Sequence, residues 1–177
     1  MGPGIDGKLR PANSYLVGYA PFETEQLWVP LVTLATRLKY KSDFSILSRR
    51  QDAWQTSRQA YRLKRGDCED HSILLADWLI ELGYDARVVI GEQNWSGHAW
   101  VVVFKDGKQH LIEATKKDAT PQFRPVRNKF AYRPYVMFNR DSFWRNSGGK
   151  LTTSYSSGSW MKTSRFEVYE PIEELEW

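Results

Sequence analysis

The sequence has little cysteine and no long apolar run, and both scarcities exclude classes of protein. A single cysteine among 177 residues excludes a disulfide within the chain, although it does not fix the redox compartment. No stretch approaches the ~20 consecutive apolar residues that a membrane-spanning helix needs. The first seven residues, Met-Gly-Pro-Gly-Ile-Asp-Gly, also lack the apolar segment of a signal peptide. We therefore expect no transmembrane segment, and the composition leaves the compartment open.

The abundant residues indicate a folded domain with a sizeable core. Apolar residues make up 41% and charged residues 26%, which argues against disorder throughout. Glycine and proline concentrate in residues 1–21, which we interpret as an extended N-terminal arm. Residues 22–177 are then expected to form a single domain, and this length is sufficient for a monomer with a real core.

The only cysteine, Cys68, stands at the start of a predicted helix. The residues from Ile73 to Leu82 are apolar on most sides, which is typical of a helix buried in a core, and Gly83 supplies a stop. Asp67 can cap the first turn, with Asp70 as its capping-box partner. The helix dipole and unpaired N–H groups would favour a thiolate at Cys68 and could stabilise an oxyanion beside it. The alternative is an inert cysteine packed as a small apolar residue.

A histidine and a carboxylate follow on two predicted strands. His98 opens a β-rich run that continues to Phe104, and Asp106-Gly107 predicts a hairpin turn. A second strand over residues 109–115 returns beside the first and carries Glu113. A carboxylate beside an imidazole can fix its tautomer and orient it toward a thiol. Helices followed by antiparallel strands indicate the α+β class.

The other two histidines are weaker candidates. His71 lies one helical turn from Cys68, and His110 lies on the second strand, opposite in facing to Glu113. We interpret both as ordinary surface or core-edge histidines. A zinc site made of Cys68, His71 and His98 is possible in ligand type, but the spacing is not diagnostic.

These motifs together resemble the transglutaminase-like superfamily. Gly-Asp-Cys-Glu-Asp at 66–70 precedes the apolar helix, Gly-His-Ala-Trp at 97–100 precedes a strand, and Asp-Ala-Trp-Gln-Thr stands at 52–56. The chain looks most like the bacterial transglutaminase-like cysteine peptidases, the group that contains the periplasmic adhesin-cleaving proteases. The resemblance covers residues 43–115 and extends more weakly to 144. It implies a papain-like transglutaminase core, in which N-terminal helices, including the nucleophile helix, pack on an antiparallel β-sheet.

The resemblance also implies a catalytic triad. Cys68 would be the nucleophile, His98 the base, and Glu113 the residue that orients His98. The family more often has aspartate at this third position, so the side chain here is one methylene longer. Gln55 or the indole N–H of Trp54 would donate to the oxyanion, although Trp54 could equally be a core residue.

The carboxylates that flank the cysteine need compensation. Asp67, Glu69 and Asp70 would raise the pKa of a neighbouring thiol, unless Lys64 or Arg65 pairs with them or a divalent cation binds. Because the adhesin-cleaving relatives depend on calcium, a Ca²⁺ site that includes these three carboxylates is a reasonable hypothesis. Calcium takes six or more oxygen ligands, and these residues do not supply a full set. The chemistry itself requires no cofactor.

We therefore expect a cysteine-dependent peptide or amide hydrolase that forms an acyl-thioester, with a protein or peptide as substrate. An amine acceptor, and hence acyl transfer, stays open. By resemblance alone, the protein is expected to be periplasmic or exported. The alternative function is a catalytically silent module that binds an anionic polymer or protein partner through the basic, aromatic region 116–165. In that region a solvated basic face with aromatics packed in the sheet is the simpler interpretation.

Overall fold

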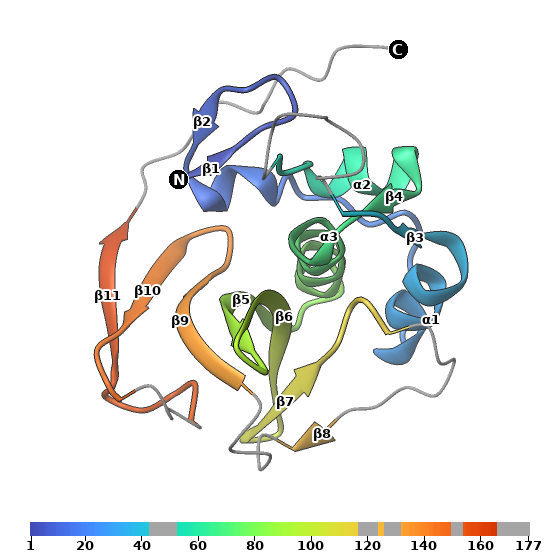
Figure 1. Cartoon of the computed structure of the whole chain (residues 1–177). Helices are drawn as coiled ribbons and strands as arrows, with labels where there is room; N and C mark the ends of the chain where they lie inside the picture. The colour runs from blue at the N-terminus through green and yellow to red at the C-terminus, as the bar shows by residue number, and fades with distance from the viewer. Residues whose placement is uncertain (43–52, 117–123, 126–131, 150–153, 166–177) are drawn as a thin grey trace.

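The computed structural model describes residues 1–42, 53–116, 124–125, 132–149 and 154–165, and Figure 1 traces the whole chain. Within these ranges the helices are one short 3-10 helix, η1, and three α-helices: η1 Ala12–Tyr15, α1 Trp28–Arg37, α2 Ser57–Leu63 and α3 Cys68–Glu81. Among the helices in this described part, none is long and apolar enough to cross a membrane.

The strands form one large sheet and two small ones. In chain order they are β1 Gly2–Pro3, β2 Leu9–Arg10, β3 Lys39–Tyr40, β4 Arg65–Gly66, β5 Asp85–Gln93, β6 Ser96–Lys105, β7 Lys108–Ile112, β8 Arg124–Pro125, β9 Tyr132–Phe138, β10 Ser142–Asn146 and β11 Trp160–Arg165. The large sheet is antiparallel throughout, in the order β11-β10-β9-β5-β6-β7-β8. β1 pairs with β2, and β3 pairs with β4. The predicted α+β class is confirmed.

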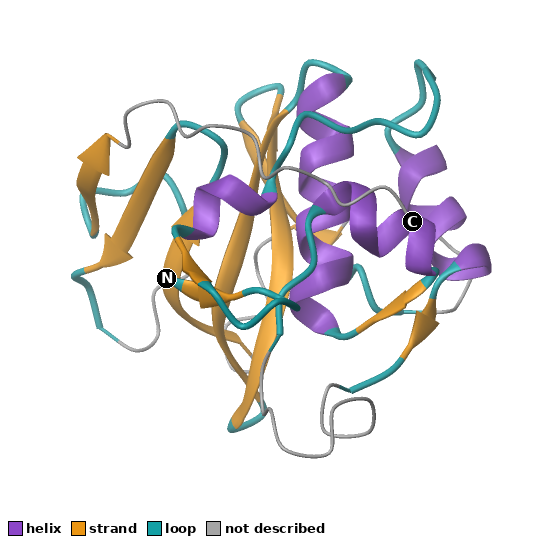
Figure 2. Cartoon of the chain, turned by 90° about the horizontal axis from the view of Figure 1, so that it is seen from above, coloured by secondary structure: helices purple, strands orange, loops and turns teal. Residues whose placement is uncertain are grey.

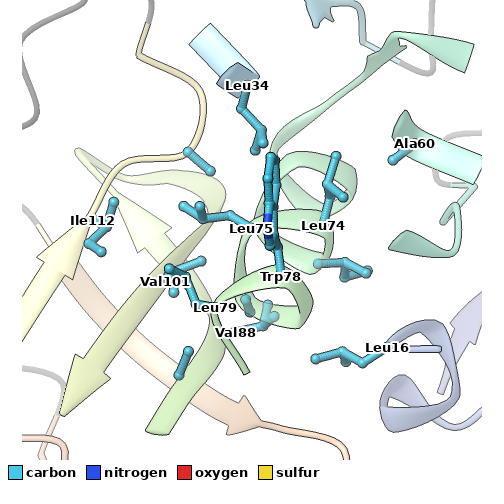
Figure 3. Close-up of a cluster of buried hydrophobic side chains, with 14 of the residues drawn as sticks. Leu16, Leu34, Ala60, Leu74, Leu75, Trp78, Leu79, Val88, Val101 and Ile112 are labelled. Atoms are coloured by element: carbon cyan, nitrogen blue, oxygen red, sulfur yellow. The ribbon is translucent and has the colours of Figure 1, made fainter. Parts of the chain in front are cut away.

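The main core lies between α3 and the sheet, and Figure 2 shows the three α-helices gathered on one side of the large sheet. Nearly every side of α3 is apolar, so the helix is buried around most of its circumference. In the close-up of Figure 3, Leu75 and Leu79 of α3 lie on the side of Val88 and Val101, which come from β5 and β6. This packing fixes the helix that begins at Cys68 against the two central strands.

The opposite face of the sheet carries a second cluster, made of Val89, Trp100, Val102, Leu111, Met137, Tyr155 and Trp160. Tyr155 and Trp160 come from the region that the sequence offers as a binding surface, yet they are 2% and 9% exposed and stack on each other. These two aromatic residues therefore serve packing. Phe123 and Phe130 lie outside the described residues. Binding of an anionic partner through this region stays a prediction.

Several predicted elements are confirmed. Thr56 caps α2, since its side-chain oxygen accepts a hydrogen bond from the backbone N–H of Gln59 at 3.1 Å. The β6–β7 hairpin turns at Asp106 and Gly107, whose φ angles are +51° and +69°. The central helix ends at Glu81, just before the predicted glycine stop.

From the sequence, the Gly, Asn and Trp residues of segment 91–97 predict a loop, and this prediction is wrong. β5 continues to Gln93 and β6 begins at Ser96, so Asn94 and Trp95 alone make the turn, with φ angles of +50° and +69°. A tryptophan at positive φ is rare, which is why the sequence does not signal a two-residue turn here. The sequence also misses β10. The strand predicted over residues 165–170 lies almost wholly outside the described residues.

The N-terminal segment 1–21 is packed against the domain rather than extended. It forms β1, β2 and η1, and Tyr15 of η1 is 1% exposed in the main core. The Tyr15 hydroxyl donates to the carbonyl of Gly2 at 2.9 Å, and Gly4 forms a parallel bridge with Trp54. This segment therefore belongs to the folded unit.

A buried carboxylate in the second half of α3 connects that helix to three other segments. Asp77 accepts hydrogen bonds from the backbone N–H of Tyr19 at 2.9 Å and from the Ser57 hydroxyl at 2.5 Å. The Arg140 guanidinium, from the β9–β10 connection, donates to the same carboxylate at 2.6 Å. Asp77 is fully buried, and these donors satisfy its charge.

Candidate active site

The first turn of α3 places the Cys68 sulfur at the edge of the main core. Cys68 is the first residue of the helix and is 7% exposed. Asp67 precedes it in an extended conformation, and its backbone N–H donates to the Asp70 carboxylate at 3.3 Å. The predicted helix start and the link between Asp67 and Asp70 are therefore present.

Asp70 is a structural residue of this turn. Its fully buried carboxylate accepts hydrogen bonds from the backbone N–H of Gln55 at 2.7 Å and from the Gln55 side-chain amide at 2.6 Å. A Cβ atom at Gly66 would stand 2.4 Å from the same carboxylate, so only glycine leaves it room. These contacts explain why glycine and aspartate flank the cysteine with this spacing.

Neither of the two predicted oxyanion donors, Gln55 and Trp54, has an N–H group that is both exposed and available for a substrate. The Gln55 amide nitrogen donates to Asp70 and to the backbone carbonyl of Arg65 at 3.1 Å, which uses both of its N–H bonds. We therefore withdraw Gln55 as the oxyanion donor. The Trp54 ring is 7% exposed and packs edge-on against Tyr15, and its indole N–H has no hydrogen-bond partner among the described residues. Trp54 is thus a core residue with an unused donor.

The surroundings of the sulfur favour the thiol over the thiolate. The Cys68 thiol donates to the Glu69 carboxylate at 3.0 Å. Burial raises the pKa of Cys68 well above its usual range, and the charges of Glu69 and Asp67 add to the rise. A hydrogen bond from the backbone N–H of Ala99 lowers the pKa of Cys68, but by less than burial and the two carboxylates raise it. The thiolate expected from the helix dipole is therefore not the resting form.

No cation among the described residues compensates these carboxylates. Lys64 and Arg65 are exposed, and neither forms an ion pair with Asp67 or Glu69 in the described part of the chain. Burial, and then the charge of Glu69, raise the pKa of Asp67 to about 8. The raised pKa favours the neutral form of Asp67 and so lessens the negative charge beside Cys68.

The same group is the candidate metal site. One ligand atom each from Asp67, Cys68 and Glu69 lies within 4.8 Å of the others, the only such cluster found in the described ranges. Asp70, which the sequence adds to this set, is engaged by Gln55 instead. Two carboxylates fit part of a calcium shell, which takes six or more oxygens, and a sulfur does not suit calcium.

The histidine and its carboxylate meet as the sequence predicts. β6 and β7 pair with Val101 opposite Ile112, and this register brings His98 and Glu113 together just beyond the last paired residues. The His98 Nε2 atom lies 2.9 Å from the Glu113 Oε2 atom. Because Nε2 faces the carboxylate, Nδ1 is the ring nitrogen left for a proton from a thiol.

Two further residues reach this pair, and sequence reasoning missed both. The Tyr132 hydroxyl donates to the Glu113 Oε1 atom at 2.6 Å, and the Gln93 side chain donates to the Tyr132 hydroxyl at 2.7 Å. Gln93 falls in the segment predicted as a loop, and Tyr132 lies in a region interpreted as a basic surface. The sequence therefore carries no local signal for either.

The start of β6 carries His98 and also contacts the Cys68 sulfur through a backbone N–H. The backbone N–H that faces the Cys68 sulfur belongs to Ala99, the residue directly after His98. The thiol's hydrogen bond goes to Glu69, and within the described part of the chain none joins it to the His98 ring. His98 and Glu113 are therefore in contact with each other, whereas the Cys68 thiol is directed at the Glu69 carboxylate.

The remaining histidines have other surroundings. His71 is fully buried on α3, with its ring edge-on to Tyr40 at 6.2 Å, so it is a core residue rather than a surface one. His110 is half-buried on β7. The metal-ligand cluster of the described ranges includes neither His71 nor His98, so the zinc set is not assembled there.

The fold that positions this site is shared with a solved structure. The calcium-bound form of LapG from Legionella pneumophila, a transglutaminase-like cysteine protease, matches with a TM-score of 0.52 at 18% sequence identity. The match covers 76% of this chain and 77% of LapG, and at this identity it shows the fold. The α+β core that the motifs imply is thus confirmed, and it is shared with LapG.

The chain belongs to the CEP76 peptidase-like domain family, whose model matches residues 52–166. It is 28% identical over 110 residues to Centrosomal protein of 76 kDa of Mus musculus, and 33% identical over 61 residues to Protein CC2D2B of Homo sapiens. These alignments cover 55% and 34% of this chain, but only 17% and 4% of the relatives. The chain therefore spans a small part of the curated relatives that it matches.

Proposed function

We propose that this domain is a cysteine-dependent peptide or amide hydrolase that works through an acyl-thioester on Cys68. The observation that supports the proposal is the contact of 2.9 Å between His98 Nε2 and Glu113 Oε2. The next residue after His98, Ala99, directs its backbone N–H at the sulfur of Cys68, the only cysteine in the chain. An imidazole oriented by a carboxylate next to a thiol is the arrangement that activates a cysteine nucleophile.

In the proposed reaction, His98 Nδ1 takes the proton of the Cys68 thiol as the sulfur attacks the substrate carbonyl carbon. The tetrahedral intermediate expels the amine, which leaves with the proton that His98 returns. Water then attacks the thioester while His98 takes its proton, and the carboxylic acid and the thiol are released. Glu113 keeps Nε2 occupied and stabilises the imidazolium formed in each half-reaction.

The backbone N–H of Cys68, in the first turn of α3, is the proposed donor to the oxyanion because helix N-termini carry unpaired N–H groups. Trp54 stays the predicted side-chain donor, since its indole N–H is unused among the described residues. Its burial means that the ring or a neighbour must shift for it to reach the substrate.

Calcium enters the proposal through the carboxylates beside the cysteine. Asp67 and Glu69 would bind the cation together with further oxygens, and its positive charge would favour the Cys68 thiolate. LapG has a calcium-bound form, which supports the idea by likeness only. The cation assists ionisation of the thiol, and the bond changes are left to the side chains.

The substrate is proposed to be a protein or peptide, with water favoured over an amine as acceptor. The expectation of a periplasmic or exported protein rests on the resemblance to bacterial peptidases, whereas the curated relatives come from Mus musculus and Homo sapiens. It stays a prediction, as does the monomeric state.

The test is hydrolysis of a mixed library of peptidyl aminomethylcoumarin amides by the wild type and by Cys68→Ala, His98→Ala and His110→Gln. Loss of a triad residue should lower the rate by about 10³-fold or more, whereas His110→Gln should keep it. Mass spectrometry should find the acyl group on Cys68. Release of coumarin that survives Cys68→Ala would refute the proposal, and incorporation of dansylcadaverine in place of hydrolysis would identify an acyl transferase.

A further inference from the structure

The carboxylate beside His98 belongs to a glutamate, and its longer side chain has one more rotatable bond than aspartate. Such a chain directs an oxygen at the imidazole only if something fixes its far end. In this structure the Glu113 Oε2 atom faces His98, and the Oε1 atom accepts a hydrogen bond from Tyr132 at 2.6 Å. We infer that Tyr132 and Gln93 are positioning residues that fix Glu113 against His98, an inference that rests on the proposed function.

The hydrogen bonds have only one consistent direction. The Gln93 amide nitrogen donates to the Tyr132 hydroxyl oxygen at 2.7 Å, and the same nitrogen lies 3.5 Å from the Glu113 Oε1 atom. An amide NH₂ can only donate, so the hydroxyl accepts from Gln93 and directs its own hydrogen at the Glu113 carboxylate. A carboxylate that accepts such hydrogen bonds is stabilised in its charged form, the form that attracts an imidazolium.

Strands rather than loops position the two donors, Gln93 and Tyr132. Gln93 is the last residue of β5, Tyr132 is the first residue of β9, and the two are directly paired. Two residues earlier, a Cβ atom at Gly91 would stand 2.1 Å from the Arg133 carbonyl oxygen, so only glycine allows β9 to come this close. The register of three adjacent strands, β9, β5 and β6, thus brings Tyr132 to the histidine side of the sheet.

The buried indole ring of Trp100 packs against both Tyr132 and His98. Trp100 is fully buried, lies edge-on to Tyr132 at 5.2 Å between ring centroids, and stacks on His98 at 6.1 Å. Its indole N–H donates to the Tyr155 hydroxyl at 3.1 Å, which fixes the indole in turn. Packing therefore restricts Tyr132 and His98 to the orientations in which Glu113 can contact both.

The experiment compares Tyr132→Phe and Gln93→Met with Tyr135→Phe, a control that changes an exposed tyrosine on the same strand. Hydrolysis of the library's most rapidly cleaved coumarin amide should show a kcat about 10- to 100-fold lower in Tyr132→Phe, with KM within about twofold of the wild type. Gln93→Met should lower kcat less, and adding it to Tyr132→Phe should change little, because the two act in series. Tyr135→Phe should match the wild type.

A second readout does not require activity. The His98 Nε2–H bonded to Glu113 should give a downfield, slowly exchanging proton resonance, identified by its loss in His98→Ala. It should broaden or vanish in Tyr132→Phe and persist in Tyr135→Phe. If the wild type hydrolyses no amide but the resonance follows this pattern, the proposed function fails and the positioning holds. A resonance and a kcat that are both unchanged in folded Tyr132→Phe would overturn the inference.

Discussion

The two halves of the candidate site differ in how completely their polar groups are satisfied. On the strands, Gln93, Tyr132, Glu113 and His98 form a continuous chain of hydrogen bonds. At the start of α3 the Cys68 thiol donates to Glu69, in surroundings that raise its pKa. The histidine half is assembled, whereas the cysteine half is kept protonated.

The difference follows from what fixes each half. Strand register determines which side chains are neighbours, so the pair formed by His98 and Glu113 depends on the backbone. Ionisation of Cys68 depends on the balance of nearby charges, which one proton or one cation can alter. Under the proposed function, activation of Cys68 would therefore depend on the charges at the start of α3, since the His98–Glu113 pair is already formed.

The largest effect should come from Asp70, because it supports the cysteine half. Asp70→Ala leaves the backbone N–H and the amide of Gln55 buried without their acceptor, so we expect a loss of roughly 3–4 kcal/mol in the free energy of unfolding. Urea denaturation measures it. Asp85→Ala, which removes an exposed ion pair with Arg87, should cost at most about 1 kcal/mol. Equal losses in the two variants would contradict this role of Asp70.

The next effect is a dependence of stability on pH. The pKa of Asp67 is about 8 in the folded protein and near 3.8 in the unfolded chain, so the unfolded chain loses this proton first as the pH rises. The contribution of Asp67 to stability should be fullest below pH 4 and be lost as the pH rises through about 8. Asp67→Asn should remove roughly 2 kcal/mol of that loss, measured by denaturation at a series of pH values. Asp141→Asn, at an exposed position, should give the same dependence of stability on pH as the wild type. If Asp67→Asn also gave the wild-type dependence, the Asp67 carboxyl would not be its source.

The charge of Glu69 should control the reactivity of the sulfur. Glu69→Gln removes a negative charge and the acceptor of the thiol hydrogen bond, so the pKa of Cys68 should fall. Alkylation by iodoacetamide at pH 7 should be slower in the wild type than for a free thiol, and about tenfold faster in Glu69→Gln than in the wild type. Glu23→Gln serves as the exposed control. A slower reaction in Glu69→Gln would mean that the carboxylate activates the thiol.

Calcium should have the smallest effect, a several-fold rise in the alkylation rate of Cys68 that EGTA reverses. The rise should be lost when Asp67→Asn and Glu69→Gln are combined, and it should persist in Asp70→Asn if that variant folds. An alkylation rate that does not change with calcium would remove the cation from the proposal. Deprotonation of Cys68 would then depend on His98 alone.

Much of this site was predictable, because its parts carry local signals. The apolar run after Cys68 predicts the buried helix, and Asp106-Gly107 predicts the hairpin that joins His98 to Glu113. The sequence could not reveal the β5–β9 pairing, which brings Gln93 to Tyr132 from 39 positions away. Contacts of this kind depend on strand order and register, which no window of sequence specifies.

The charge state of the sulfur was also beyond the sequence. The helix dipole and the flanking carboxylates act in opposite directions, and the outcome depends on how deeply the side chains are buried. The role of Gln55 also depended on burial, since from the sequence its amide could donate either to a substrate or to a buried Asp70. Both questions were settled by packing around one turn of helix.

The buried Asp77 limits how the domain can move. It tethers the helix that begins at Cys68 to the N-terminal segment through Tyr19, to α2 through Ser57, and to the sheet through Arg140. A helix tied in three directions cannot slide or rotate as a rigid rod without breaking all three ties at once. Under the proposed function, a polypeptide would therefore reach the sulfur through a rearrangement near the N-terminal end of α3, while the rest of the helix keeps its position.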